Sequence, residues 1–250
     1  VRFGVCFTLL LIPTAFMGGT LPVISRTLVR RFSRFGADIG RLYAINTFGA
    51  VVGIIIVTFY LMEEYGLQGT IYVTACGNFI VGGLACWLGR TQAEDEKTKM
   101  ASFTSNDTAD TETPPSTLKK TVLVGFCLSG FAALGYEVAW TRLLTVAFAA
   151  NSQYEFSIIL ISFLLGLSMG SFFCSRFLHR NRDLLTAFAS IEILIGLMAL
   201  LSVPVFSLLP GWIAVVKTAE SWWGFRGGIF AISIATITFP TLLMGAAFPL

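Results

Sequence analysis

Long apolar runs separated by short polar stretches dominate the pattern of this chain. The runs cover residues 3–24, 42–62, 70–88, 121–144, 154–175, 184–209 and 228–250. About 20 consecutive apolar residues in a helix cross the hydrocarbon core of a bilayer, so each run predicts one membrane-spanning helix. The pattern therefore predicts an all-α polytopic membrane protein with about seven transmembrane helices.

The amino-acid composition leads to the same fold class. Hydrophobic residues make up 55% of the 250 residues and charged residues 12%, whereas soluble domains average about 25% charged residues. So few charges cannot cover a water-facing surface. The lipid bilayer is therefore the expected partner of most side chains, and no nucleic acid is expected among the partners.

One segment has a different composition from the rest. Residues 90–120 hold five Lys or Arg and six Asp or Glu, and Ser, Thr and the pair Pro114-Pro115 fill much of the remainder. This segment has too few apolar groups to offset the entropy lost on ordering. We therefore expect a disordered linker between two groups of helices.

The positive charges predict the orientation of the spans. Lys and Arg concentrate in the loop after the first apolar run, in the linker and in the loop around Arg176–Arg182, which all fall on one side if seven runs cross the bilayer. Cytoplasmic loops carry the excess of positive charge, so the linker is expected on the cytoplasmic side. The tryptophans Trp212, Trp222 and Trp223 fit the opposite, outer interface.

An internal repeat organises the chain. Residues 13–22 and 240–249 share the pattern P-T-x-x-M-G-x-x-x-P, which makes the first and seventh runs equivalent and predicts a parallel repeat of six helices. On this reading residues 1–89 hold the last three helices of one half and residues 121–250 the first four of the next. Two six-helix halves joined by a cytoplasmic linker form the architecture of the major facilitator superfamily. The chain begins with Val1 and its last run ends without a polar tail, so we expect a fragment of a longer protein.

Three further blocks carry a resemblance to a known family. They are residues 40–50 (GRLYAINTFGA), 129–144 (SGFAALGYEVAWTRLL) and 163–171 (FLLGLSMGS). Together with the repeat they resemble the membrane region of spermidine synthase-like proteins, in which a facilitator-like membrane module is fused to a spermidine synthase domain. The resemblance implies a multi-pass protein, expected in a bacterial inner membrane, which anchors a catalytic domain and moves polyamines or related amines.

The synthase activity itself is not expected in this chain. The aminopropyltransferase domain of such proteins uses decarboxylated S-adenosylmethionine as co-substrate, with a glycine-rich loop after a strand. The sequence shows no alternation of strands and helices and no such loop, and its acidic cluster Glu94–Glu96 lies in the linker. No cofactor and no catalytic residue is therefore assigned to this chain. The co-substrate would belong to the parent protein, if that protein carries an active synthase domain.

Polar groups at membrane depth are the candidates for a ligand site, because burying a charge in lipid is costly. Glu137 lies in the fourth run, and its neighbours Tyr136 and Trp140 carry aromatic rings that attract cations. These three residues are the hypothetical binding site for a cationic amine. Glu192, in the sixth run, lies about two helical turns nearer to the cytoplasmic face than Glu137, so a direct pair between the two carboxylates is not expected.

The other polar residues in or near the apolar runs have structural interpretations. Arg142 and Glu155 are expected to form an ion pair near the outer interface, and Asn46 and Asn78 to form interhelical hydrogen bonds. Glu192 is interpreted as structural, with a role in transport as the alternative.

Small residues and cysteines indicate packing. Gly49-x-x-x-Gly53, Gly166-x-x-x-Gly170 and the glycines at 77, 82 and 83 predict close helix packing, and Pro13 and Pro240 predict matched bends. The five cysteines lie in apolar runs without metal-binding spacing and His179 is the single histidine, so we expect buried thiols and no metal site.

Three functions remain open on the sequence. The chain is the membrane module of a spermidine synthase-like protein, a stand-alone secondary transporter of the major facilitator type with an unknown ligand, or a membrane scaffold that binds no ligand.

Overall fold

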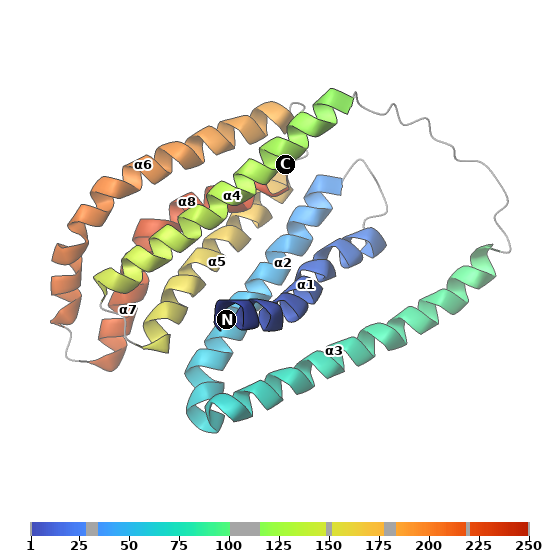
Figure 1. Ribbon diagram of the computed structural model, residues 1–250, viewed down its shortest axis with the longest axis horizontal. Helices are drawn as coiled ribbons and strands as arrows, with labels where there is room; N and C mark the ends of the chain where they lie inside the picture. Colours follow the sequence, from blue (N-terminus) through green and yellow to red (C-terminus); the bar gives the residue numbers. More distant parts are fainter. Residues whose placement is uncertain are drawn as a thin grey trace. The chain divides into compact units, whose positions relative to one another are not determined.

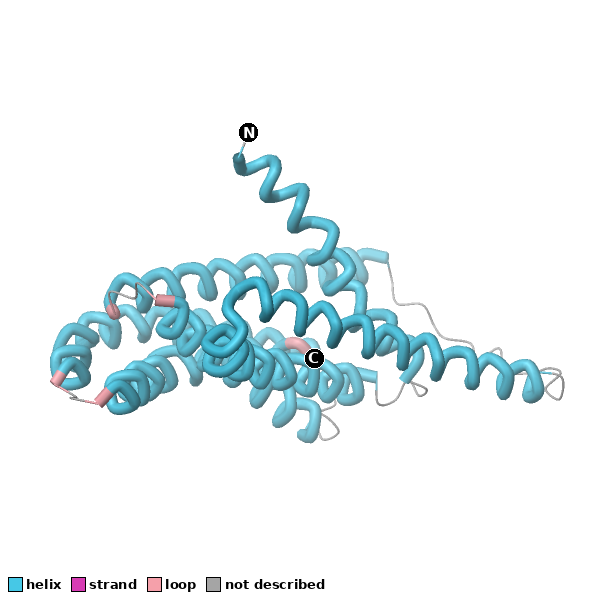
Figure 2. The backbone as a smooth tube through the Cα atoms, turned by 90° about the horizontal axis from the view of Figure 1, so that it is seen from below, coloured by secondary structure: helices cyan, strands magenta, loops and turns pink. Residues whose placement is uncertain are grey.

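The computed structural model of the chain describes residues 2–28, 35–100, 116–148, 152–177, 184–218 and 221–249. Its elements in chain order are α1 (Arg2–Leu28), α2 (Phe35–Ile56), the π-helix η2 (Val57–Leu61), α3 (Met62–Met100), α4 (Ser116–Ala147), α5 (Gln153–Phe177), α6 (Leu184–Lys217), α7 (Trp222–Ser233), the π-helix η4 (Ile234–Thr238) and α8 (Phe239–Ala247). These described parts are helical and contain no strand, as the tube in Figure 2 shows. The predicted all-α fold class is confirmed.

Six helical segments in the described parts are long and apolar enough to cross a membrane. They are Arg2–Ser25, Gly36–Arg90, Val122–Ala147, Gln153–Arg176, Leu184–Lys217 and Trp222–Ala247. Leucine, isoleucine, valine and phenylalanine cover much of their outward surface, which suits contact with lipid. By the length and composition of its helices, the chain is a membrane-spanning protein.

The count of six differs from the expected seven because the second and third apolar runs merge. The segment Gly36–Arg90 is 55 residues long, or about 80 Å at 1.5 Å per residue, more than twice the thickness of a hydrocarbon core. Within it, Gly66 has φ of 64° and ψ of −175°, a conformation outside any helix and accessible almost only to glycine. The expected boundary between the two apolar runs therefore coincides with a break in the helical backbone at Gly66.

The expected linker is partly helical. Helix α3 continues to Met100 and α4 begins at Ser116, while residues 101–115 lie outside the described part. Ala, Glu and Lys are good helix formers, and they are frequent between Ala93 and Met100, which explains how the helix extends into a charged segment. The basic loops at 29–34 and 178–183, including His179, also lie outside the described residues.

Two compact units divide the chain. The first comprises Val1–Ile55 and Ser129–Leu250, and the second comprises Ile56–Leu128. The second unit contains η2, which contacts α3, and the first part of α4. The candidate site lies wholly in the first unit, so the rest of the description concerns that unit. The six-helix halves inferred from the repeat are a different division and stay a prediction.

Helix α5 is the central helix of the first unit. It packs against α7, η4 and α8 (Figure 1), and its side chains Ile159, Ser162 and Phe163 are buried. On its other face, Ser168 Oγ donates a hydrogen bond to the Ala44 carbonyl and Ser171 Oγ to the Gly40 carbonyl, each at 2.9 Å. Helix α5 is thus held between α2 and the α7–α8 segment.

Close contact between α5 and α8 depends on glycine. A methyl group added at Gly166 or Gly170 of α5 would overlap atoms of α8, and one added at Gly245 of α8 would overlap the α5 backbone. The predicted packing role of Gly166-x-x-x-Gly170 is therefore confirmed. At Gly49 and Gly53 no described atom of another element lies within 4 Å of an added methyl group, so the packing role predicted there stays a prediction.

The same result applies to the third group of glycines. Gly77, Gly82 and Gly83 of α3 also have no described neighbour within 4 Å of an added methyl group. Their small size indicates that a close approach is possible at this surface of α3, but no described helix uses it. The close packing expected at these three positions likewise stays a prediction.

The expected distortion at Pro240 takes the form of the π-helix η4. Proline has no N–H and its ring clashes with the carbonyl four residues earlier in an α-helix, here that of Thr236. Widening the preceding turn to a π-helix moves that carbonyl away from the ring. Pro13, the equivalent residue of the repeat, lies inside α1 with no π-helix beside it, so the helix differs in local form at the two prolines, and the matched bend stays a prediction.

The two copies of the repeat also differ in their surroundings. Pro240, Thr241, Met244 and Gly245 are buried within the first unit. Residues 13–20 of α1 are exposed, and the same pattern therefore packs inside the unit in one copy and lies at its surface in the other.

Candidate ligand site between α4, α6 and α8

One face of α4 carries the polar and small residues that build the site. Ser129, Ala132, Ala133, Tyr136 and Trp140 follow one another at intervals of three, one, three and four residues, the spacing that places side chains on a single helix face. The first four of these residues are partly exposed, and Trp140 is 4% exposed. This face of α4 is directed at α6.

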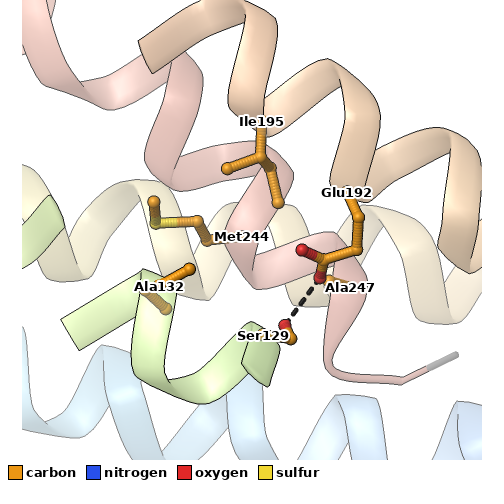
Figure 3. Close-up of a pocket in the computed structure, with 7 residues that line it drawn as sticks. Ser129, Ala132, Glu192, Ile195, Met244 and Ala247 are labelled. Atoms are coloured by element: carbon orange, nitrogen blue, oxygen red, sulfur yellow. Dashed lines mark hydrogen bonds between the residues drawn. The ribbon is translucent and has the colours of Figure 1, made fainter. Parts of the chain in front are cut away.

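Glu192 is the carboxylate that this face contacts. Its Oε1 accepts a hydrogen bond of 2.6 Å from Ser129 Oγ (Figure 3). Ser129 lies eight residues before Glu137 on α4, a separation of about 12 Å along the helix. That is the depth difference that the sequence indicates between the two carboxylates, and the structure accordingly joins Glu192 to Ser129 and not to Glu137.

A small cavity adjoins the Glu192 carboxylate. Its volume is about 30 Å³, and a cavity of roughly 10–15 Å³ already holds a water molecule. The lining residues come from three helices: Ser129, Ala132 and Ala133 of α4, Glu192 and Ile195 of α6, and Met244 and Ala247 of α8. We call this space the Glu192 cavity. Its polar side chains are the carboxylate and one hydroxyl, and its other side chains are apolar.

A second hydrogen bond joins α4 to α6 further along both helices. Trp140 Nε1 donates to Ser202 Oγ at 3.3 Å, in a buried environment. The two contacts on α4 are eleven residues apart and the two on α6 are ten residues apart, in the same chain direction. Helices α4 and α6 therefore run parallel over about 16 Å, as expected for spans separated by one intervening helix.

The three residues predicted to bind a ligand are brought together in part. The rings of Tyr136 and Trp140 are stacked with centroids 5.3 Å apart, and Trp140 is fully engaged in packing. Glu137 is half-buried at the edge of the same face, within electrostatic range of Tyr43 of α2. Tyr43 in turn stacks on Phe248, with ring centroids 4.1 Å apart. Glu137 thus lies toward α2, whereas the Glu192 cavity lies toward α8.

The other predicted contacts are not formed. Arg142 is exposed, and in the described chain it makes no ion pair with Glu155; the carboxylate of Glu155 instead accepts a hydrogen bond from Ser152. Asn46 and Asn78 are exposed, and no interhelical hydrogen bond of either side chain occurs among the described residues. The buried face of α2 runs through Ala44, Thr47 and Val51, and Asn46 lies off that face.

Sequence reasoning did not find Ser129, Met244 or Arg226. Ser129 lies at the start of the resemblance block and shares a helix face with Trp140, so helical spacing was an available signal.

Arg226 lies in the membrane-spanning segment Trp222–Ala247, and its side chain is buried, with 9% exposed. Its guanidinium carbon lies 3.1 Å from the centre of the Trp222 ring and 4.1 Å from that of Tyr154.

The described residues provide no group of three His, Cys, Asp or Glu side chains that could hold a metal ion. The expected burial of the cysteines is wrong for four of them. Cys6, Cys76, Cys86 and Cys127 are exposed and Cys174 is partly exposed. A thiol on the outer face of an apolar helix packs against lipid as a small hydrophobe, which explains its place in an apolar run.

Comparison of the chain with protein-family models, with curated proteins and with solved structures finds no match.

Proposed function

We propose that this chain is a membrane module that binds and moves a cationic amine, and that it is the membrane part of a spermidine synthase-like protein. The observation that carries the proposal is the pair of carboxylates in membrane-spanning helices, Glu137 on α4 and Glu192 on α6. A carboxylate at membrane depth is costly unless a partner compensates it. An ammonium group is the partner of opposite charge that such a site takes.

The surroundings of the carboxylates support a cation over an anion. The Glu192 cavity is lined by a carboxylate, a hydroxyl and apolar side chains, and no Lys or Arg lines it. Next to Glu137 in the chain is Tyr136, which is partly exposed and stacks on the buried Trp140, and the π-electron face of an aromatic ring attracts cations. An anion would meet the negative charge of Glu192 with no compensating group from the lining.

The proposed architecture is that of the major facilitator type. The repeated P-T-x-x-M-G-x-x-x-P pattern and the parallel course of α4 and α6 support two six-helix halves, with residues 121–250 contributing four helices of one half. In such transporters, ligands bind near the membrane midplane between helices. The interface between α4, α6 and α8 is a location of that kind.

Catalysis belongs to a different domain in this proposal. The described residues contain no strand, whereas the aminopropyltransferase domain expected from the resemblance has a glycine-rich loop after a strand. The parent protein would therefore bind decarboxylated S-adenosylmethionine in a soluble domain on the cytoplasmic side. The membrane-spanning helices of this chain would anchor that domain and move the amine across the membrane.

The proposal is tested by transport in reconstituted vesicles. The full-length protein in liposomes is expected to accumulate radiolabelled spermidine, and Glu137→Gln to abolish accumulation while the protein elutes from a sizing column as the parent does. Arg142→Gln is the matched control, because it removes an exposed charge from the same helix. Equal uptake by protein-containing and empty liposomes would exclude transport and leave an anchoring role. Unchanged uptake by Glu137→Gln would reduce that residue to a structural role.

Transport by itself does not separate a synthase-linked module from a stand-alone transporter. Reading the coding sequence past Leu250 does. Two further spans followed by a nucleotide-binding-type domain are the expected result, and a stop codon directly after two further spans would favour the stand-alone transporter.

A further inference from the structure

The Glu192 cavity has the chemistry of a site for one ammonium group. Ser129 Oγ donates its hydrogen to Glu192 Oε1, which leaves Oε2 and the lone pairs of Ser129 Oγ to accept hydrogen bonds. An ammonium group has N–H donors and no acceptor, like the end of a lysine side chain. Acceptors from a carboxylate and a hydroxyl match those donors, and the carboxylate supplies the opposite charge.

Size restricts the ligand further. A cavity of about 30 Å³ has room for one or two groups the size of a water molecule. The ammonium group of a primary amine and its first methylene fit that space, whereas a trimethylammonium group carries three additional carbon atoms around the nitrogen. The cavity therefore favours the end of an unbranched primary amine over a fully methylated one.

The apolar part of the lining also favours a primary amine over a fully methylated one. Ala132, Ala133, Ile195, Met244 and Ala247 offer methyl and methylene groups and a thioether, which suit the first methylene of an alkylamine. The lining contains no aromatic ring, and aromatic cages are the usual means of binding quaternary ammonium groups. The shape and chemistry of the lining agree with the limit set by the volume.

We propose that the Glu192 cavity binds the terminal ammonium group of an unbranched primary alkylamine, with Glu192 as counter-charge, Ser129 as hydrogen-bond partner and Ala133 as one of the size-limiting residues. This inference rests on the proposed function for its physiological meaning, because it names the class of amine and the place where its charged end is held. The Glu192 cavity, and not the surroundings of Glu137, is then the place where primary and methylated amines are discriminated.

The test is direct binding to the full-length protein in lipid nanodiscs. Radiolabelled methylammonium is expected to bind saturably and to be displaced by propylamine but not by tetramethylammonium. Glu192→Gln is expected to weaken binding about tenfold or more, because a hydrogen bond to a charged group and the counter-charge are both lost. Ala133→Leu is expected to abolish binding by filling the cavity.

Two variants keep the test valid if a substitution disturbs folding. Ala189→Leu adds the same bulk at an exposed position of α6 and should bind as the parent does. Ser129→Ala keeps the cavity open while removing one acceptor, and should weaken binding by a few-fold. Each variant is compared only after it elutes from a sizing column as the parent does.

The outcomes separate this inference from the transport proposal. Selective methylammonium binding without spermidine uptake would exclude translocation and leave the site in place. Spermidine uptake that is unaffected by Glu192→Gln and Ala133→Leu would overturn the site and leave translocation in place. Absence of methylammonium binding, or displacement by tetramethylammonium as effective as that by propylamine, would also overturn the site.

Discussion

The guanidinium group of Arg226 lies over the ring of Trp222, with its central carbon 3.1 Å from the ring centroid. Trp222 is one helical turn before Arg226 on α7, and the second ring, that of Tyr154, belongs to the first turn of α5. A cation between two aromatic faces is held most strongly where water is excluded, and Arg226 is buried. The contact therefore joins the first turns of α5 and α7.

Loss of this contact is expected to destabilise the protein. Arg226→Ala should cost about 2 kcal/mol, the strength of a desolvated cation–π contact, and should lower the midpoint of thermal aggregation in detergent. Arg226→Lys should lose less, because it keeps the charge while giving up the planar stacking of a guanidinium. Arg142→Ala serves as the control on an exposed arginine. A midpoint for Arg226→Ala equal to that of the Arg142 variant would contradict the role of the aromatic contact.

Glycine substitutions are expected to have opposite effects at two places with the same sequence pattern. Gly170→Ala should destabilise by about 1–3 kcal/mol, because its methyl group would overlap the α8 backbone and must push the helices apart. Gly53→Ala, with open space at the added methyl group, should be neutral or stabilising by up to about 1 kcal/mol, because alanine favours helix. The measurement is the thermal midpoint of each variant. An equal decrease of the midpoint in both would show that α2 also packs closely at Gly53.

These two glycine pairs show what helical spacing predicts and what it omits. The G-x-x-x-G spacing correctly identifies a surface that another helix can approach, but it does not name that helix. Gly170 meets residues of α8 more than 70 positions later in the chain, while Gly53 has no described neighbour. Long-range pairing depends on how each helix is rotated, and that information is absent from the local pattern.

The candidate site was predictable to a similar extent. Depth along the helices correctly separates Glu137 from Glu192, because 1.5 Å per residue holds in any α-helix. The rotation of α4 that turns Ser129 toward Glu192 is decided by packing between three helices. The place of Arg226 was equally hidden, because the ring of Tyr154 belongs to another helix, 72 residues earlier in the chain.

The membrane topology yields a third prediction. If the 55-residue segment Gly36–Arg90 crosses the bilayer twice, with Gly66 at the turn, Glu64 and the linker lie on opposite sides. A Cys at position 64 should then react with a membrane-impermeant maleimide from outside intact cells, and a Cys at position 105 only after the membrane is permeabilised, each in a background without native cysteines. Labelling of both positions from the same side would show that the segment crosses once and would remove the even spacing on which the repeat depends.

The last prediction concerns the register between α4 and α6. Trp140→Phe removes the donor of the hydrogen bond to Ser202 and Ser202→Ala removes the acceptor, and each is expected to cost about 1 kcal/mol. Only Ser202→Ala strands a buried polar group, the Trp140 N–H, because Ser202 Oγ also donates a hydrogen bond to the Ala199 carbonyl. If the two side chains are in contact, the double variant should cost clearly less than the sum of the single ones, since the Trp140 N–H that Ser202→Ala strands is absent from the double variant. The measurement is thermal stability of the four proteins in detergent, with Ser207→Ala, an exposed serine of the same helix that bonds its own backbone, as the control. Additive losses would place the two residues out of contact, and the parallel register of α4 and α6 would then rest on the Ser129–Glu192 bond alone.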